Sequence, residues 1–254
     1  MIQGIIFDYG GTIDTNSKHW SEVLWEGYTN VGIPICKDDF RSSYVHAERA
    51  LASHPYIKPE HNFLDLLTIK CDLETADLMM RGVWQVADDE RREKSDAVAR
   101  YCYDYVLNVL KISRPIIARL AEKYPLVLVS NFYGNIETVL EDFRLQYFSR
   151  IVESAVVGVR KPDPQIFQLG VEALRKITGK TEEVLPASDI IVIGDSFSKD
   201  IVPATQIGCK TVWIKGIGWG NEEVDESIPT YIIDSIERLE VVVDLQNTHN
   251  PIKR

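Results

Sequence analysis

The chain has 254 residues, which is enough for one large domain or for one domain that carries an insertion. Its apolar content of 45% and charged content of 26% are ordinary for a globular protein. The net charge of −10 argues against a nucleic-acid-binding surface, because phosphate backbones require clustered Lys and Arg. The short basic run Arg91, Arg92 and Lys94 lies among acidic residues, which predicts a solvated helix face.

The cysteines and the N-terminus predict a cytoplasmic location. Cys36, Cys71, Cys102 and Cys209 are scattered, without CxxC or zinc-type spacing, so we expect free thiols in a reducing compartment. The N-terminus lacks a basic region followed by a long apolar run, which predicts no signal peptide. No stretch approaches the roughly 20 apolar residues that span a bilayer. We therefore expect no membrane partner and no nucleic-acid partner.

The first 106 residues predict one strand followed by helices. Residues 2–7 (IQGIIF) form a short β-branched run that is typical of a buried strand. From about residue 16 to about residue 106 the chain is aromatic-rich and charged, with apolar residues at helical spacing. The first of these helices begins near Trp20, and Asn16 or Ser17 is the expected cap.

From about residue 107, apolar strands alternate with helices. This alternation indicates βαβ units and a parallel sheet that is covered on both faces. The first strand belongs to this set by character, so the simplest architecture is one α/β core interrupted by a helical module. The expected helices are 114–123, 135–142, 164–177, 199–206 and 235–245, and the expected strands are 125–130, 150–155, 189–194, 210–214 and 230–234.

Polar side chains follow several of these strands, and the carboxyl ends of parallel strands are where α/β proteins place their active sites. Each residue alone has a structural explanation, such as a turn or a helix cap; Asp163, for example, is expected to cap the helix that Pro164 begins. Their combination in this order favours a functional site. The residues are Asp8 after the first strand, Ser130 and Asn131 after the second, Asp195 with Asp200 after 189–194, and Lys161 between them.

These residue types suit phosphoryl transfer. The carboxylates of Asp8 and Asp195 are hard oxygen ligands for Mg²⁺. Ser130 can donate a hydrogen bond to a phosphate oxygen, and Lys161 supplies a positive charge. Asp8 is then a candidate nucleophile that forms an aspartyl-phosphate. Gly10 and Gly11 permit close approach of the backbone.

In four ordered motifs the sequence resembles the haloacid dehalogenase-like (HAD) hydrolase superfamily. The motifs are FDYGGTID (7–14), LVLVSNF (126–132), KPDPQIF (161–167) and IVIGDSFSKDI (191–201). The run VPATQIGCKTVWI (202–214) is similar to the segment that members of this family carry directly after the fourth motif. Together they span the whole core. Any one of them is a weak signal, but their combination is specific.

The resemblance implies an α/β, Rossmann-like core of residues 1–15 and 107–254, with a helical C1-type cap of residues 16–106. It implies an Mg²⁺-dependent phosphatase that acts on a small phosphorylated metabolite. It also implies a role for each matching residue: Asp8 is the nucleophile and a metal ligand; Gly10 contributes a carbonyl to the metal; Ser130, Lys161, Asn131 and Gly11 bind the phosphoryl group; Asp195 binds Mg²⁺; and Asp200 holds Lys161 or the metal's waters.

One position departs from the family pattern. Family phosphatases usually carry a second aspartate two residues after the nucleophile, which protonates the leaving group and activates water. Here that position is Gly10. General acid–base assistance is typically worth about 10²–10⁴ in rate, so the substitution affects the expected activity. Asp14, His19 and Tyr9 are possible substitutes, although capping, surface and packing roles are the ordinary explanations for them.

Three functions are compatible with this departure. The favoured one is a phosphatase whose acid and base come from elsewhere or whose leaving group needs little protonation. The second is a weak or inactive descendant that binds phosphate or a protein partner. The third is a metal-independent 2-haloacid dehalogenase, which the retained pair Gly194 and Asp195 disfavours. The run GIGWGN (216–221) is not a dinucleotide fingerprint and is expected to form a loop near the site.

Overall fold

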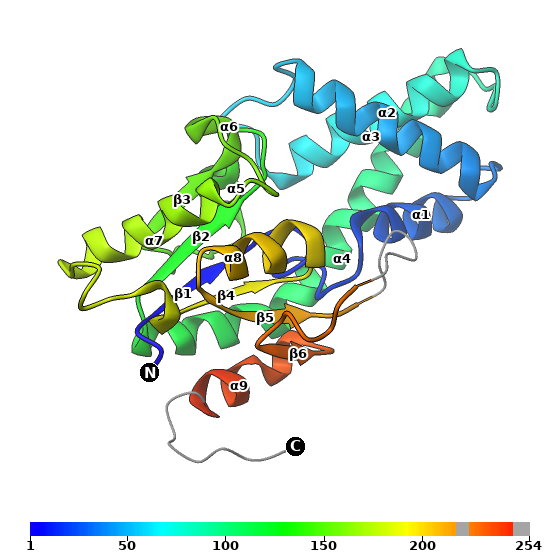
Figure 1. Cartoon of the computed structure of the whole chain (residues 1–254). Coiled ribbons are helices and arrows are strands. Elements are labelled where there is room, and N and C mark those ends of the chain that lie inside the picture. The colour runs from blue at the N-terminus through cyan, green and yellow to red at the C-terminus, as the bar shows by residue number, and fades with distance from the viewer. Residues whose placement is uncertain (217–223, 246–254) are drawn as a thin grey trace. The chain divides into compact units, whose positions relative to one another are not determined.

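The computed structural model describes residues 1–216 and 224–245. Its centre is a six-stranded sheet in which every neighbouring pair is parallel, in the order β3-β2-β1-β4-β5-β6 (Figure 1). The predicted α/β class with a helical insertion is therefore confirmed. The strands are β1 (Gly4–Phe7), β2 (Leu126–Ser130), β3 (Arg150–Glu153), β4 (Ile190–Gly194), β5 (Lys210–Ile214) and β6 (Tyr231–Ile233).

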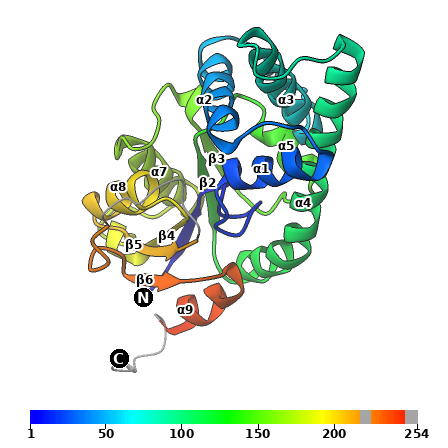
Figure 2. The same cartoon turned by 90° about the vertical axis from the view of Figure 1, so that its right-hand side faces the viewer.

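The order of the strands places β1 at the topological switch point of the sheet, with β2 and β3 on one side and β4, β5 and β6 on the other. Phe7 pairs with Leu128 of β2 on one side and with Ile193 of β4 on the other. Ligand sites of open α/β sheets lie in the crevice outside the carboxyl ends of strands at this point. The residues that follow β1, β2 and β4 therefore meet where a site is expected, whereas β6 forms a far edge of the sheet (Figure 2).

The sheet belongs to a compact unit of residues 1–18, 109–132 and 145–254. Helix α7 covers one face, where Phe167 and Leu174 pack on Ile6 and Val129. The C-terminal part of α4 is joined to α9 by the ion pair of Arg119 with Glu240. The helical elements of this unit are the last part of α4 (Asp88–Lys123), α6 (Ser154–Val157), α7 (Gln165–Thr178), η1 (Ala187–Asp189), η2 (Phe197–Ile201), α8 (Val202–Gln206), η3 (Ile236–Arg238) and α9 (Leu239–Leu245).

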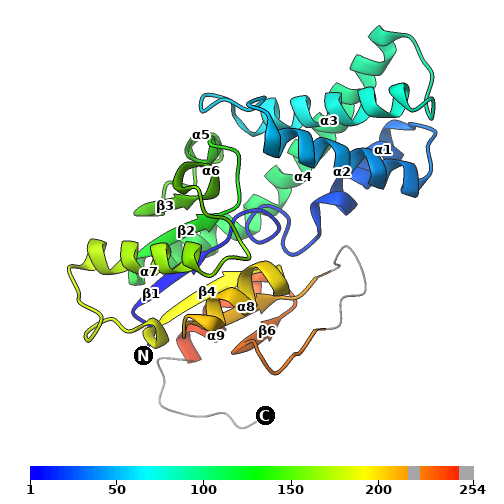
Figure 3. The ribbon, with the colours of Figure 1, turned by 45° about the horizontal axis from the view of Figure 1, so that its top comes forward.

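A second compact unit contains residues 19–108 and 133–144 and is helical. Helix α2 packs against α1 and α3 (Figure 3). Asn62 and Asp65 form a reciprocal capping box at the start of α3. The unit is made of α1 (Trp20–Val31), α2 (Lys37–Ser53), α3 (Phe63–Met80), the first part of α4 and α5 (Ile136–Asp142). The domain boundaries 16 and 106 remain a prediction.

Several local predictions were wrong. The helix expected at 114–123 is the end of the much longer α4, which begins at Asp88. His19, rather than Asn16 or Ser17, caps α1, because its ring nitrogen accepts the N–H of Ser21. Helix α7 begins at Gln165, one residue after the start expected at Pro164, so Pro164 is its N-cap; the expected contribution of Asp163 is present, since its carboxylate accepts the N–H of Gln165.

Three further observations concern charge, hydropathy and one predicted loop. Arg91 is buried rather than solvated, because its guanidinium is bonded to Asp72, Asp88 and Thr75. Among the helices of the described residues, none combines the length and apolar character that crossing a bilayer demands. The predicted loop at 216–221 lies outside the described residues except for Gly216.

Candidate active site

Asp8 lies directly after the central strand, and a single helical turn follows it. Its main-chain N–H still donates to the carbonyl of Ile193 on β4, at 2.9 Å. The N–H of Ile13 then donates to the carbonyl of Tyr9, also at 2.9 Å, which closes the turn. Residues four apart lie on one face of a helical turn, and Thr12 accordingly places its hydroxyl 3.1 Å from Asp8 Oδ2. The turn therefore holds one oxygen of the Asp8 carboxylate.

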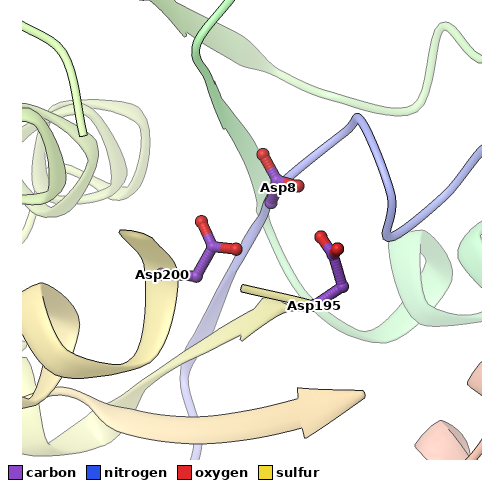
Figure 4. A group of neighbouring side chains, drawn as sticks. All are labelled: Asp8, Asp195 and Asp200. Carbon is purple, nitrogen blue, oxygen red and sulfur yellow. The ribbon is translucent and has the colours of Figure 1, made fainter. Parts of the chain in front are cut away.

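Two more carboxylates converge on Asp8. One ligand oxygen from each of Asp8, Asp195 and Asp200 lies within 4.8 Å of the other two (Figure 4). Asp195 is the first residue after β4, and Asp200 lies in η2, a π-helical turn. The N–H of Ser196 donates to Asp200 Oδ2 at 3.0 Å, which directs the other oxygen of Asp200 toward the cluster. The sequence places these residues at strand ends, and the structure brings them together.

Lys161 is the cation of this cluster. Its buried Nζ lies 2.5 Å from Asp8 Oδ1 and 2.7 Å from Asp200 Oδ1. Asn131 holds the main chain of Lys161 at two points, since its Nδ2 donates to the lysine carbonyl at 3.1 Å and its Oδ1 accepts the lysine N–H at 2.9 Å. Asn131 thus positions Lys161 in this structure, while its expected contact with substrate stays a prediction.

The charges of the cluster do not balance. Three carboxylates face one ammonium group, so two negative charges are left when all four side chains are ionised. Burial raises the pKa of Asp8 to about 6, with Lys161 opposing the rise and Asp200 adding to it. Burial also raises the pKa of Asp195 well above its usual range, and the Asp8 and Asp200 charges add to that effect.

This imbalance fits a bound divalent cation. Carboxylate oxygens are the ligands that Mg²⁺ prefers, and a nearby dication favours the ionised form of buried carboxyl groups. Asp195 directs its carboxylate toward the cluster (Figure 4), and a dication held there would oppose the rise in its pKa. The donor set therefore matches a magnesium site formed by Asp8, Asp195 and the neighbouring Asp200.

Gly11 must be glycine for two reasons. Its φ of +98° lies in the region that favours glycine, and a Cβ there would lie 2.3 Å from Asp195 Oδ2. Its N–H donates to Asp14 Oδ1 at 2.7 Å. A contact of Gly11 with substrate stays a prediction.

Gly10 precedes Gly11 and is exposed, and it presents no side chain. Its proposed carbonyl contact with a metal also stays a prediction.

Ser130 ends β2 and is buried, with Glu153 of β3 as its neighbour in register. Within the described part of the chain, no hydrogen bond joins Ser130 to the Asp8 cluster. It lies at the same carboxyl edge of the sheet, where strand order places it next to the end of β1. Its expected contact with the phosphoryl group stays a prediction.

Each of the possible substitutes for the missing acid has a structural contact. Asp14 is fully buried and holds the Gly11 N–H. His19 uses its Nδ1 to cap α1. Tyr9 is also fully buried and packs edge-on against Phe132, with ring centroids 5.6 Å apart. The Asp14 charge also adds to the raised pKa of Asp195, so Asp14 lies near the cluster, and a role of any of the three as the acid stays a prediction.

Sequence reasoning missed Thr12 as a member of the site. Its hydroxyl lies 3.1 Å from Asp8 Oδ2 and 3.1 Å from Asp195 Oδ1, so it bridges the two candidate metal ligands. A hydroxyl has one proton and can donate it to only one of two carboxylates. The signal in the sequence is the four-residue spacing from Asp8, which becomes informative only once a helical turn follows the strand.

Comparisons with known proteins find sequence relatives and solved structures of the same fold. One relative, the glyceraldehyde 3-phosphate phosphatase of Pyrococcus furiosus, is 31% identical over 109 residues, so the match spans 42% of this chain and only 40% of that protein. The HAD-hydrolase YfnB of Bacillus subtilis, solved bound to magnesium, shares the fold with a TM-score of 0.55 at 16% identity, over 96% of this chain and 99% of that one. A dehalogenase solved as an intermediate complex shares it with a TM-score of 0.59 at 13% identity, over 95% and 96%.

The match to a protein family covers far more of the chain than the match to the phosphatase relative. Residues 2–208 match the haloacid dehalogenase-like hydrolase family, and that span includes every member of the Asp8 cluster. The resemblance stated from the four motifs is thereby confirmed. The chain belongs to the haloacid dehalogenase-like hydrolase family.

Proposed function

We propose that this protein is an Mg²⁺-dependent phosphatase that hydrolyses a small phosphomonoester through an aspartyl-phosphate on Asp8. The observation that supports this most directly is the convergence of Asp8, Asp195, Asp200 and Lys161 at the switch point of a parallel sheet. The three carboxylates of this cluster carry more charge than Lys161 neutralises, so they would repel a dianionic phosphoryl group. A bound cation removes that repulsion, which is why the proposal includes Mg²⁺.

Asp8, Asp195 and Asp200 would hold the cation, with Asp200 acting directly or through water. When bound, Mg²⁺ neutralises charge on the phosphoryl oxygens and lowers the pKa of the carboxyl groups around it. Lys161 Nζ stabilises the equatorial oxygens of the phosphoryl group while Asp200 keeps it in place. Ser130 would donate its hydroxyl to a further phosphoryl oxygen.

The reaction has two displacements at phosphorus. A carboxylate oxygen of Asp8 forms a bond to phosphorus as the bond to the ester oxygen breaks, and the leaving alkoxide takes a proton from solvent or from a general acid. Water then forms a bond to phosphorus, the bond to Asp8 breaks, and the proton of that water goes to solvent. Phosphate leaves and Asp8 is regenerated. Thr12 and Lys161 each hold one oxygen of Asp8, which orients the nucleophile.

The glycine at position 10 determines which leaving groups are favourable. Without a carboxylic acid there, the departing oxygen receives little proton assistance, so turnover depends steeply on the pKa of the leaving alcohol. We expect aryl phosphates to be hydrolysed much faster than alkyl phosphates by the wild-type protein. In Gly10→Asp, alkyl phosphates should gain the most and the difference between the classes should shrink.

The substrate is proposed by class only. The phosphatase relative acts, by its name, on glyceraldehyde 3-phosphate. Together with the retained Asp8 cluster, this supports a small phosphorylated metabolite as the substrate of this chain. The short stretch that matches that relative does not extend the proposal to the same triose phosphate.

The test is a phosphatase screen with and without Mg²⁺, using wild type, Asp8→Asn and Gly10→Asp. The proposal predicts release of phosphate that requires Mg²⁺ and disappears in Asp8→Asn. If wild type and Asp8→Asn release phosphate at the same trace rate, with or without Mg²⁺, the result would contradict an enzymatic role. It would favour a protein that binds phosphate or a partner. Release of halide from 2-haloacids in EDTA would favour the dehalogenase alternative. If alkyl phosphates gain nothing in Gly10→Asp, the explanation given for the missing acid is wrong.

A further inference from the structure

Trp213 forms a hydrogen bond to the main chain of a candidate metal ligand. It lies on β5, where its register partner is Gly194, the last residue of β4. Its indole Nε1 donates to the carbonyl oxygen of Asp195 at 2.8 Å. Asp195 follows β4, and the only hydrogen-bond donor of the indole ring is directed at its carbonyl. Trp213 is nearly fully buried, at 6% exposure, and the hydrogen bond is partly buried.

The same indole ring also contacts the segment that carries Asp200. Its centroid lies 5.3 Å from that of Phe197, with the two rings inclined at 58°. Phe197 is the first residue of η2, the π-helical turn that presents Asp200. Turns of this kind are rare and are often found at functional sites. Trp213 therefore contacts the short segment between the two acidic residues of the site at Asp195 and at Phe197.

This segment has little room to rearrange. A Cβ on Gly194 would lie 2.4 Å from the Cβ of Asp200, so the strand end and the π turn are in close contact. The N–H of Asp200 donates to the carbonyl of Ser196 at 2.8 Å, and the N–H of Ser196 donates back to the Asp200 carboxylate. Because an aspartate has only two side-chain torsions, a shift of the Asp195 main chain moves its carboxylate. That main chain is held by the indole of Trp213.

We propose that Trp213 is a positioning residue for the divalent cation, which it serves by fixing the main chain of Asp195 and the start of η2. This inference rests on the proposed function, since it concerns the same magnesium site. Groups that hydrogen-bond to the surroundings of a metal ligand typically change metal affinity by about 10- to 100-fold when they are removed. We expect the lower part of that range, because the indole bonds the main chain of Asp195 and leaves its carboxylate intact.

The experiment measures Mg²⁺ binding by isothermal titration calorimetry, without substrate, on wild type, Trp213→Phe and Trp84→Phe. Trp84 is the matched control, since it is a tryptophan of similar burial, at 4% exposure, in the other compact unit. Trp213→Phe keeps an aromatic ring against Phe197 and removes the N–H. We expect its Kd for Mg²⁺ to rise about tenfold, with Trp84→Phe unchanged. Hydrolysis of an aryl phosphate by Trp213→Phe should return toward the wild-type kcat when Mg²⁺ is raised.

A second replacement keeps the test decisive if Trp213→Phe folds poorly. Benzothienylalanine at position 213 has the shape of tryptophan and lacks only the N–H, so packing on Phe197 is preserved. A weaker Mg²⁺ affinity in this variant supports the inference. Unchanged affinity in both variants, beside measurable binding by wild type, overturns it and leaves the proposed function standing. An absence of Mg²⁺ binding by wild type itself overturns both.

Discussion

Replacing Lys161 by methionine should destabilise the protein strongly, because among the described residues Lys161 is the ammonium group that compensates the buried carboxylates of the site. Its Nζ is bonded to Asp8 and Asp200, and its side chain is only 2% exposed. Removing one partner of a buried ion pair costs about 3–5 kcal/mol, since the other charge stays buried without compensation. We expect that loss in the free energy of unfolding at pH 7.5 in EDTA.

The loss should shrink as the pH falls. In wild type the pKa of Asp8 is already raised to about 6 by burial, although Lys161 lowers it. Without Lys161 the pKa of Asp8 must be higher still, so the folded variant binds a proton at a pH where the folded wild type does not. Stability rises as pH falls wherever the folded state binds more protons than the unfolded state, by up to about 1.4 kcal/mol per pH unit for each extra proton. The two proteins should therefore differ less at pH 5.5 than at pH 7.5.

The assay is urea denaturation followed by circular dichroism at both pH values. Lys70→Met is the matched control, since Lys70 is an equally buried lysine, paired with Glu48 in the other compact unit. Adding Mg²⁺ should restore part of the stability of Lys161→Met and none of that lost in Lys70→Met, because a cation replaces only the charge at the Asp8 cluster. A loss below about 1 kcal/mol at pH 7.5, under the cost of an uncompensated buried charge, would refute the electrostatic account of the site. So would a loss that is the same at both pH values.

Three further predictions rest on single contacts. Asn131→Ala should lower kcat about tenfold, as expected for two lost positioning hydrogen bonds on the Lys161 main chain, with Mg²⁺ affinity unchanged by calorimetry. Glu74 is fully buried, and burial raises its pKa to about 7. Glu74 should therefore contribute a fall of about 3 kcal/mol in wild-type stability as pH rises from the unfolded value near 4.5 through 7, and denaturant titrations of Glu74→Gln should show a fall that is smaller by that amount. Gly194→Ala should weaken Mg²⁺ binding and cost about 1–3 kcal/mol in the same titrations, because the new Cβ overlaps Asp200; wild-type behaviour would mean that the contact relaxes freely.

The sheet and the acidic site were predictable because both depend on local signals. Strands buried on both faces are continuous apolar runs, and β5 was predicted to the residue as KTVWI. The carboxyl ends of parallel strands share one edge, so the polar residue after each run identifies a member of the site. Asp8 and Asp195 were found in this way, and the structure brings their carboxylates together.

The features that the sequence did not reveal depend on contacts between distant residues. Asn16 has the chemistry of a helix cap, but its side chain is hydrogen-bonded to Ser235 and to the N–H of Ile236, about 220 positions away. The residue that caps α1 is His19, which directly precedes the helix. The hydrogen bond from Trp213 to the Asp195 carbonyl likewise could not be predicted from the sequence, because it depends on the pairing of β4 with β5. The helix was expected at 114–123, yet α4 runs unbroken from Asp88 to Lys123, even though Pro115 inside it is a helix breaker by propensity.

The central claim is that Asp8 is the nucleophile of a magnesium-dependent phosphoryl transfer. Its most direct test is to quench wild type with borohydride during turnover of an aryl phosphate and to analyse the peptide that contains Asp8 by mass spectrometry. An aspartyl-phosphate is reduced to homoserine, so the account predicts homoserine at position 8 when both Mg²⁺ and substrate are present, and unmodified aspartate when either is omitted. Continued phosphate release with Asp8 unmodified, or the same release by Asp8→Asn, would contradict it.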